Sequence, residues 1–437
     1  MHPLLERLLI PGAPSALRQG QSPGPEDWRA LASLSALGAP ADAEAARYVV
    51  RQHAVSRGVR PASIAAFYAA RARGEVASFT VPAVNVRGMT FDIAAALFRA
   101  VIAHDGVAIF EINRAELGFT GQTPAEFATS VLAAACAEGY DGPVFLQADH
   151  MMLNAAAFAA DPAAEVDAVW KLMDACIAAS FWNIDIDAST LVDLSFARVE
   201  DQQRVNAEVT ADLARRIRGQ DPDRFEISIG GEIGEVGSHN TTVEELTAYC
   251  DQVLSLYPET RLRKVSVQTG TKHGGVVLPD GTIADVNLDF ETLREISRVG
   301  RERYGMAGAV QHGASTLPEE LFSRFPAVET AEVHLATGFQ SIVFDHPAFP
   351  LDLRAAMEAH ARAHLGADRK AADSEAQFLH SARRKLWGPF KAELWSLETP
   401  IREAIGLALE ERFRALQISL GVQDFGRMAK KLAQQSV

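Results

Sequence analysis

The chain alternates short apolar runs with amphipathic stretches between about residues 78 and 349. The runs have the length and the Val, Ile and Phe content of buried strands, and the stretches between them carry apolar residues at helical spacing. Eight such runs occur, at 79–86, 106–113, 143–150, 181–188, 224–231, 264–271, 307–314 and 331–338. Eight strands, each joined to the next by a segment long enough for a crossover helix, predict an α/β fold of the (β/α)8 or TIM-barrel type.

The two ends of the chain lack this alternation. Residues 1–77 and 350–437 are rich in Ala, Arg and Leu at helical spacing, which predicts a helical extension on each side of a barrel over 78–349. The alternative architecture is an open, doubly wound sheet. Because no GxGxxG phosphate loop follows the first strand, the barrel is favoured.

Composition and charge restrict the partners that we expect. The 437 residues are 48% hydrophobic, enough for a large core, and their net charge of −14 argues against a nucleic-acid partner. We expect a cytoplasmic protein with no membrane partner, since no secretion signal or membrane-length apolar stretch is present. The three cysteines form no CxxC pair, so neither a disulfide framework nor a thiolate zinc site is indicated.

Three histidines lie at or just beyond the C-terminal ends of predicted strands, where barrel enzymes place their reactive groups. They are His150, His273 and His312, from the third, sixth and seventh strands. One such histidine is more often a structural group, but three imidazoles on one rim can bind Zn²⁺ or another divalent cation. The sequence therefore predicts a metal site with His150, His273 and His312 as ligands.

Acidic residues at the same rim are candidates for proton transfer and for support of the metal. Asp149 precedes a predicted ligand, so its carboxylate could move protons, or it could orient an imidazole. Asp187 and Glu232 could bind a second cation or orient the histidines, and Glu232 is also a candidate catalytic group. Either residue could instead cap the following helix.

The loops after the seventh and eighth strands are candidates for phosphate binding. The first contains Gly313 and Ser315, and the second contains Thr337. These loops are the usual phosphate-binding place in barrels, although a plain turn with a helix cap is the alternative. We expect Asn85 and Gly274 to complete a substrate-binding set with them.

Short motifs over residues 80–340 resemble those of class II fructose-bisphosphate aldolases. They are VPAVNV at 81–86, ADH at 148–150, IDAS at 186–189, EIGEVG at 232–237, GTKHGG at 270–275 and HGAST at 312–316. The resemblance implies metal-dependent, reversible aldol cleavage of a ketose phosphate, with Asp149 catalytic and His150 a ligand. It also implies a phosphorylated sugar as substrate and, as in the family, self-association into a homo-oligomer.

The chain departs from the family pattern at three places, one of which is the lysine that usually follows the HG of GTxHG and is absent here, where GGVVLPDG follows. The loop after EIGEVG reads SHNTT where the family carries an acid, so His239 is a candidate replacement, and the eighth-strand NIDT pattern reads His334-Leu335-Ala336-Thr337. The stretch EINRAELGFTGQTPAEF at 111–127 is also similar to the accessory subunit of tagatose-bisphosphate aldolase. A non-catalytic accessory or chaperone-like subunit, an epimerase, and a metal-dependent aldolase of a different sugar remain alternatives.

Overall fold

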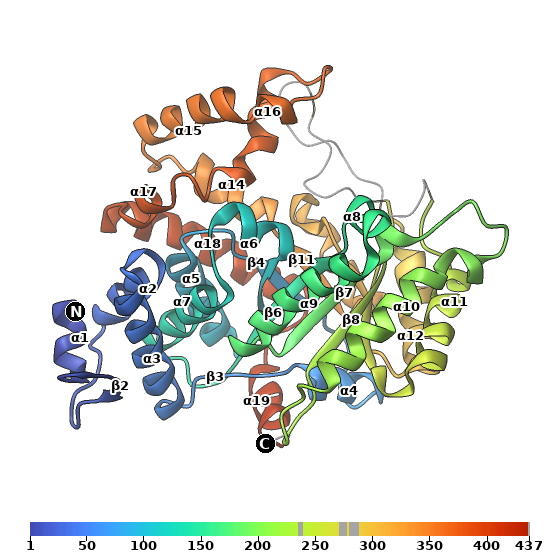
Figure 1. The fold of residues 1–437 in the computed structure, drawn as a ribbon, viewed down its shortest axis with the longest axis horizontal. Coiled ribbons are helices and arrows are strands. Elements are labelled where there is room, and N and C mark those ends of the chain that lie inside the picture. Colours follow the sequence, from blue (N-terminus) through green and yellow to red (C-terminus); the bar gives the residue numbers. More distant parts are fainter. Residues whose placement is uncertain (235–238, 271–277, 279–287, 436–437) are drawn as a thin grey trace.

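The computed structural model describes residues 1–234, 239–270, 278 and 288–435. Its centre is a closed barrel of eight parallel strands (Figure 1). The strands are β4 Val81–Asn85, β5 Ile109–Asn113, β6 Pro143–Met152, β7 Asn183–Asp187, β8 Ser228–Gly234, β9 Leu262–Val267, β10 Ala309–Gln311 and β11 Glu332–Leu335. Each pairs with its sequence neighbours, and β11 pairs with β4 to close the ring. The TIM barrel is therefore confirmed, and the open sheet is excluded.

Every expected strand overlaps an observed one, and the largest differences lie at the fifth and sixth. The fifth runs over Ser228–Gly234 instead of 224–231, and the sixth over Leu262–Val267 instead of 264–271. After β9 the Gln268 side chain accepts hydrogen bonds from the backbone N–H groups of Thr269 and Gly270. This local turn replaces strand pairing and ends the strand earlier than the apolar run suggests.

Helices cover the outside of the barrel, as its parallel connections require. The longer ones among the described residues are α5 Thr90–His104, α7 Pro124–Ala137, α9 Pro162–Ala178, α10 Val199–Arg218, α11 Val243–Leu256, α12 Phe290–Tyr304 and α14 Thr337–Asp345. Short helices α6 Arg114–Thr120 and α8 Ala155–Ala160 follow β5 and β6. Capping boxes start two of them, with Asn113 and Glu116 at α6 and Thr242 and Glu245 at α11.

The segment before β4 contains four helices, a small sheet and a further short strand. The helices are α1 Pro3–Leu8, α2 Asp27–Leu37, α3 Pro40–Ser56 and α4 Ala65–Ala72. Strands β1 Leu9–Ile10 and β2 Ala13–Leu17 pair antiparallel, and β3 Arg60–Pro61 adds to β6. The expectation of helices alone therefore misses this small sheet, because its strands are too short to show a repeating pattern.

The segment after the barrel is helical and returns to it. Its helices are α15 Leu351–His364, α16 Glu375–Ala382, α17 Lys391–Trp395, α18 Thr399–Ser419 and α19 Gly426–Gln435. Helix α18 packs against α5, and α19 packs against α4. Asp92 at the start of α5 pairs with Arg29 from α2 and Arg402 from α18, each at 2.9 Å. One carboxylate thus links both terminal segments to the barrel, whose division from them at residues 78 and 349 stays a prediction.

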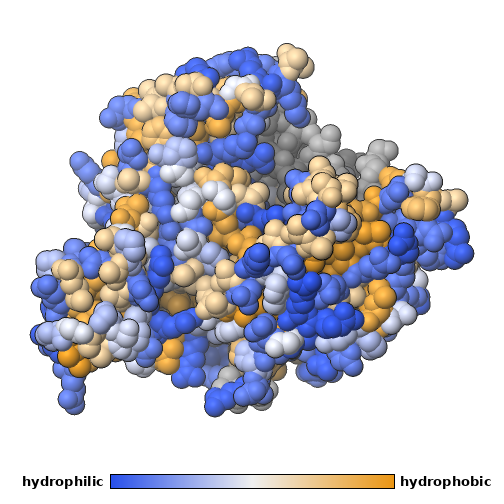
Figure 2. Space-filling model, in the orientation of Figure 1, coloured by the Kyte–Doolittle hydropathy of each residue, from blue (hydrophilic) through white to orange (hydrophobic). Residues whose placement is uncertain are grey.

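The surface mixes hydrophilic and hydrophobic side chains over both the terminal helices and the barrel on the face shown in Figure 2. The three cysteines are buried, as expected for small apolar residues. Among the helices that the structure describes, none is long and apolar enough to cross a membrane.

Candidate functional site

A bulge in β6 places two consecutive polar residues in the mouth of the barrel. In a regular strand, neighbouring residues point to opposite faces. The pairing register between β6 and β7 shifts between Ala148 and Met151, and His150 has a left-handed backbone with φ of 40°. As a consequence, a carboxylate oxygen of Asp149 and a ring nitrogen of His150 lie within 4.8 Å of each other. A bulge changes the direction of a side chain, and here it turns His150 toward the same space as Asp149.

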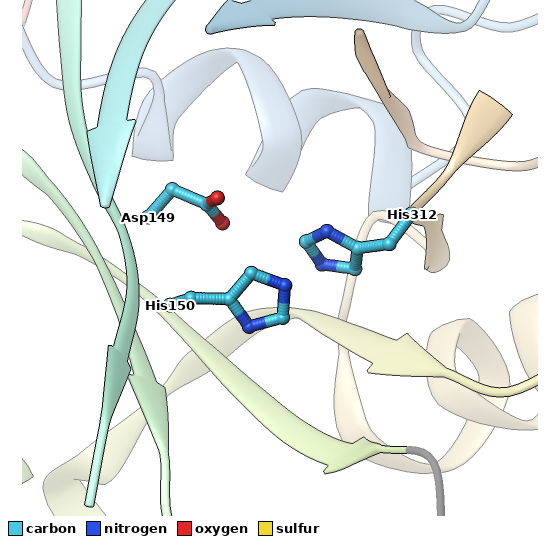
Figure 3. Close-up of side chains that lie close together, drawn as sticks. All are labelled: Asp149, His150 and His312. Atoms are coloured by element: carbon cyan, nitrogen blue, oxygen red, sulfur yellow. The ribbon is translucent and has the colours of Figure 1, made fainter. Parts of the chain in front are cut away.

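The structure brings His150 together with His312, which follows β10. The centroids of the two rings are 4.0 Å apart. One ligand atom from each of Asp149, His150 and His312 lies within 4.8 Å of the others, and Figure 3 shows these three side chains facing one another. We call Asp149, His150 and His312 the first cluster. The third predicted ligand, His273, and the neighbouring Gly274 lie outside the described residues.

Groups behind the two imidazoles fix their orientation. His150 donates from Nδ1 to Asp187 Oδ2 at 3.1 Å, and Glu232 Oε2 lies 2.8 Å from the same nitrogen. A hydrogen bond of 3.0 Å joins His312 Nε2 to Ser266 Oγ. When a carboxylate or hydroxyl holds one ring nitrogen, the other is set to bind a metal. The donor set suits a divalent cation, and Asp149 Oδ1 is a buried oxygen without a hydrogen bond among the described residues.

The electrostatics of the first cluster show an excess of buried negative charge. Burial lowers the pKa of His150, but Glu232 and Asp149 outweigh burial and raise that pKa well above its usual value. Burial, together with the charge of Asp187, raises the pKa of Glu232 to about 7. A divalent cation in place of the imidazole proton would relieve the same excess.

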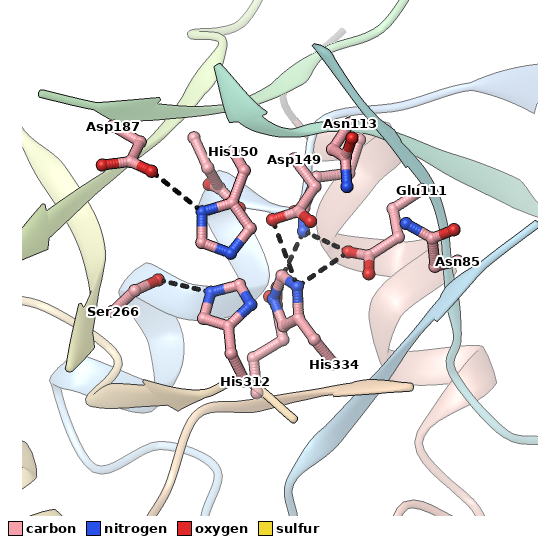
Figure 4. Close-up of polar contacts among 12 residues, drawn as sticks. Asn85, Glu111, Asn113, Asp149, His150, Asp187, Ser266, His312 and His334 are labelled. Atoms are coloured by element: carbon pink, nitrogen blue, oxygen red, sulfur yellow. Dashed lines mark hydrogen bonds and ion pairs between the residues drawn. The ribbon is translucent and has the colours of Figure 1, made fainter. Parts of the chain in front are cut away.

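A second group of ligand-type side chains, which no predicted site includes as a set, lies beside the first. His334 Nδ1 is 3.0 Å from Glu111 Oε2 and 3.2 Å from Asp149 Oδ1 (Figure 4). Ligand atoms of these three residues, from β5, β6 and β11, lie within 4.8 Å of one another. We call Glu111, Asp149 and His334 the second cluster. The two clusters share Asp149, and the rings of His312 and His334 have centroids 4.1 Å apart.

A buried lysine on β9 supports the second cluster from below. Lys264 Nζ lies 2.9 Å from Asp185 Oδ2, donates to Gln147 Oε1 at 2.8 Å and pairs with Glu332. Glu332 in turn accepts a 2.7 Å hydrogen bond from His334 Nε2. The neighbouring Gly230 leaves room for this network, since a Cβ there would lie 2.3 Å from Asp185 Oδ1.

The pKa values in the second cluster follow from burial and mutual charge. Burial would raise the pKa of Asp149, but the positive charges of His150 and His334 hold it well below its usual value. Burial and the Asp149 charge raise the pKa of Glu111 to about 7. Burial lowers the pKa of His334, yet Glu111 and Asp149 outweigh burial and raise it well above its usual value. Asp149 is thus a carboxylate at neutral pH.

The predicted phosphate loops meet above the barrel. Gly338 donates its backbone N–H to Ser315 Oγ at 3.1 Å, and a Cβ at Gly338 would lie 2.4 Å from the Ser315 carbonyl oxygen. Gly313 has a φ of 68°, and Thr337 starts α14. Asn85 donates to Glu116 Oε2 at 2.6 Å from the end of β4. The two loops are therefore close enough to act together, and their binding role stays a prediction.

His239, the candidate replacement for the acid of the family's loop, contacts the start of α11. Its side chain is 51% exposed, and Nε2 lies 3.1 Å from Glu245 Oε1 in the capping box of α11. Its predicted role in proton transfer stays a prediction, because residues 235–238 before it lie outside the described residues.

Residues 69–384 match the family model of class II fructose-bisphosphate aldolase. The match spans well over half of the chain, so the chain belongs to the class II fructose-bisphosphate aldolase family. A search of curated proteins gave no match.

Solved structures share the fold at low sequence identity. A probable tagatose 6-phosphate kinase from Sinorhizobium meliloti has a TM-score of 0.54 at 16% identity, over 81% of this chain and 100% of that one. A fructuronate-tagaturonate epimerase from Cohnella laeviribosi has a TM-score of 0.54 at 13% identity, over 86% and 84%. A fructose-bisphosphate aldolase from Campylobacter jejuni has a TM-score of 0.48 at 16% identity, over 82% and 94%. The likenesses to the kinase and to the epimerase show the fold alone.

Proposed function

We propose that the chain is a divalent-metal-dependent aldolase that reversibly cleaves a ketose phosphate. The observation that carries this proposal is the first cluster, in which Asp149, His150 and His312 converge at the C-terminal mouth of the barrel. Membership of the class II family supports this choice of reaction class. His150 and His312 would hold the cation together with the predicted ligand His273, and Zn²⁺ suits this imidazole-rich set.

A bound cation would supply Lewis-acid polarisation of the substrate carbonyl. Asp149 is the proton carrier, because its carboxylate is ionised, buried and next to both imidazoles. In the cleavage direction it accepts the proton of the hydroxyl beside the bond that breaks. The electron pair of the O–H bond forms the carbonyl bond of the aldehyde product as the carbon–carbon bond breaks. The electron pair of the broken bond moves to the carbon next to the substrate carbonyl. Return of a proton to that carbon releases the second product.

The supporting groups have separate tasks in this proposal. Asp187 and Glu232 hold the His150 ring in place, and Ser266 holds the His312 ring. The backbone N–H groups and hydroxyls of the loops at Ser315 and Thr337 would bind a substrate phosphate. A net charge of −14 makes these local donors and the cation the features that attract an anionic substrate.

The test is a retro-aldol assay on a panel of ketose mono- and bisphosphates, followed by ¹H NMR in D₂O and by metal analysis of the same samples. We expect aldehyde release by wild type, and loss of activity and of the first-cluster cation in His312→Asn. The matched control is His364→Asn, on an exposed turn of α15, which should behave as wild type. Carbon-bound deuterium without cleavage would instead indicate an epimerase. Metal-free protein without turnover would favour an accessory subunit.

A further inference from the structure

The described part of the barrel interior holds a group of buried carboxyl side chains. Six buried carboxyl groups project from five strands, and they belong to Glu111, Asp149, Asp185, Asp187, Glu232 and Glu332. Lys264 lies among them with three imidazoles. Buried carboxyl groups need a positive partner or a proton, so the space among them is a place where a cation can bind.

The second cluster has the spacing of a metal-ligand set. Its two measured edges, from His334 Nδ1 to Glu111 Oε2 and to Asp149 Oδ1, are 3.0 and 3.2 Å. Ligands at 2.0–2.1 Å in a tetrahedral site lie about 3.3 Å from one another. All three side chains are at least nine-tenths buried and come from three different strands. Only a small adjustment would therefore bring the three atoms around one ion.

Two of these atoms lack the hydrogen bonds that they should have in a simple ion-pair network. Within the described residues, His334 Nδ1 and Asp149 Oδ1 are buried and make no hydrogen bond. Their contacts are the ion pairs of His334 Nδ1 with Glu111 and Asp149. The opposite nitrogen, Nε2, is occupied by Glu332 at 2.7 Å. This is the arrangement in which a carboxylate orients an imidazole so that its other nitrogen binds a metal.

We propose that Glu111, Asp149 and His334 bind a second divalent cation, with the carboxylate of Asp149 shared between the two clusters. A mixed nitrogen and oxygen set of this kind suits Zn²⁺ or Mn²⁺. Gln147 supports it by donating to Glu111 Oε2 at 3.1 Å. The site consists wholly of described residues and goes beyond the proposed function, since it does not depend on the reaction that the first cluster performs.

The experiment is a metal titration of the full-length chain. Protein stripped with a chelator is titrated with Mn²⁺, and separately with Zn²⁺, by isothermal calorimetry, and bound metal is counted after desalting. Wild type and His364→Asn should hold two equivalents per chain, whereas His334→Asn, Glu111→Gln and His312→Asn should each hold one. Circular dichroism checks that every variant is folded. The metal count of the wild type tests the proposal even if a variant does not fold. Anomalous diffraction from Mn²⁺-soaked wild-type crystals should show two peaks.

The outcomes separate this proposal from the proposed function. A single equivalent that is lost in His312→Asn and kept in His334→Asn would overturn the second site and leave the aldolase centre intact. A single equivalent lost in His334→Asn and Glu111→Gln but kept in His312→Asn would support the second site and remove the centre on which the proposed function depends. Wild type that binds no divalent cation would overturn both.

Discussion

The two clusters share one carboxylate, Asp149, but they relate differently to the family pattern. The first is built where the sequence follows that pattern, at ADH and HGAST. The second includes His334, which replaces the asparagine of the NIDT pattern, and Glu111, which opens the EINRAEL stretch. These two residues are far apart in the chain but in contact in the fold. The second cluster therefore joins His334, at the departure from NIDT, to Glu111 and to the Asp149 of the ADH motif.

The clusters also differ in how they are supported. In the first, the His150 side chain is 14% exposed and is held by Asp187 and Glu232 near the rim. In the second, the His334 side chain is 4% exposed and rests on Glu332, which pairs with the buried Lys264. The second cluster therefore depends on the deep interior of the barrel, and a change there should affect stability as well as binding.

Asp149→Asn should have the largest effect, because this residue belongs to both clusters. Loss of the proton carrier should lower kcat by about 10²–10⁴-fold. If the carboxylate is shared, the amide should also weaken binding of the second cation, while the first cation stays bound. The measurement is steady-state kinetics of retro-aldol cleavage combined with metal counting. Unchanged kcat would contradict the role of Asp149, and an unchanged metal count would contradict its shared role.

Lys264→Met should show how much the buried lysine below the second cluster contributes to the stability of the protein. The substitution leaves Asp185 and Glu332 buried without their cation, which should cost about 3–5 kcal/mol in the free energy of unfolding. Urea denaturation of the metal-free protein measures this loss. The control is Arg298→Met, whose exposed pair with Glu302 on α12 should contribute at most about 0.5 kcal/mol. Equal losses in both variants would show that Lys264 does not support the core.

The sequence predicted the barrel and the first cluster better than the second. Eight apolar runs are a strong periodic signal, and His150 and His312 stand at strand ends where chemistry is expected. Single polar residues inside strands carry a weaker signal, since Glu332 and His334 look like interruptions of a short apolar run. Their spacing of two residues could have shown that both point into the barrel. The bulge at His150 has no sequence signature, because it arises from pairing between β6 and β7.

Paired substitutions behind the two histidines compare the clusters directly. Asp187→Asn removes the carboxylate that orients His150, and Glu332→Gln removes the one that orients His334. Asp187→Asn should lower the affinity for the first cation, and Glu332→Gln the affinity for the second, each by about 10–100-fold. Groups behind the ligands contribute that much to metal affinity. Competition with a fluorescent chelator measures both affinities. If Glu332→Gln lowers only the affinity for the first cation, the assignment of His334 to a separate site is wrong.

Ser315→Ala should have the smallest effect and tests the rim above both clusters. The variant removes the hydroxyl that accepts the Gly338 N–H, a hydrogen bond that contributes about 1 kcal/mol and so about a fivefold change. If the two loops bind phosphate, KM should rise by that factor for a phosphorylated ketose and stay constant for the unphosphorylated sugar, with kcat little changed. Ser323→Ala, whose hydroxyl bonds to Glu320, is the control. An equal rise in KM for both sugars would show that the loops shape the barrel mouth without recognising phosphate, because only a phosphate contact distinguishes the two substrates.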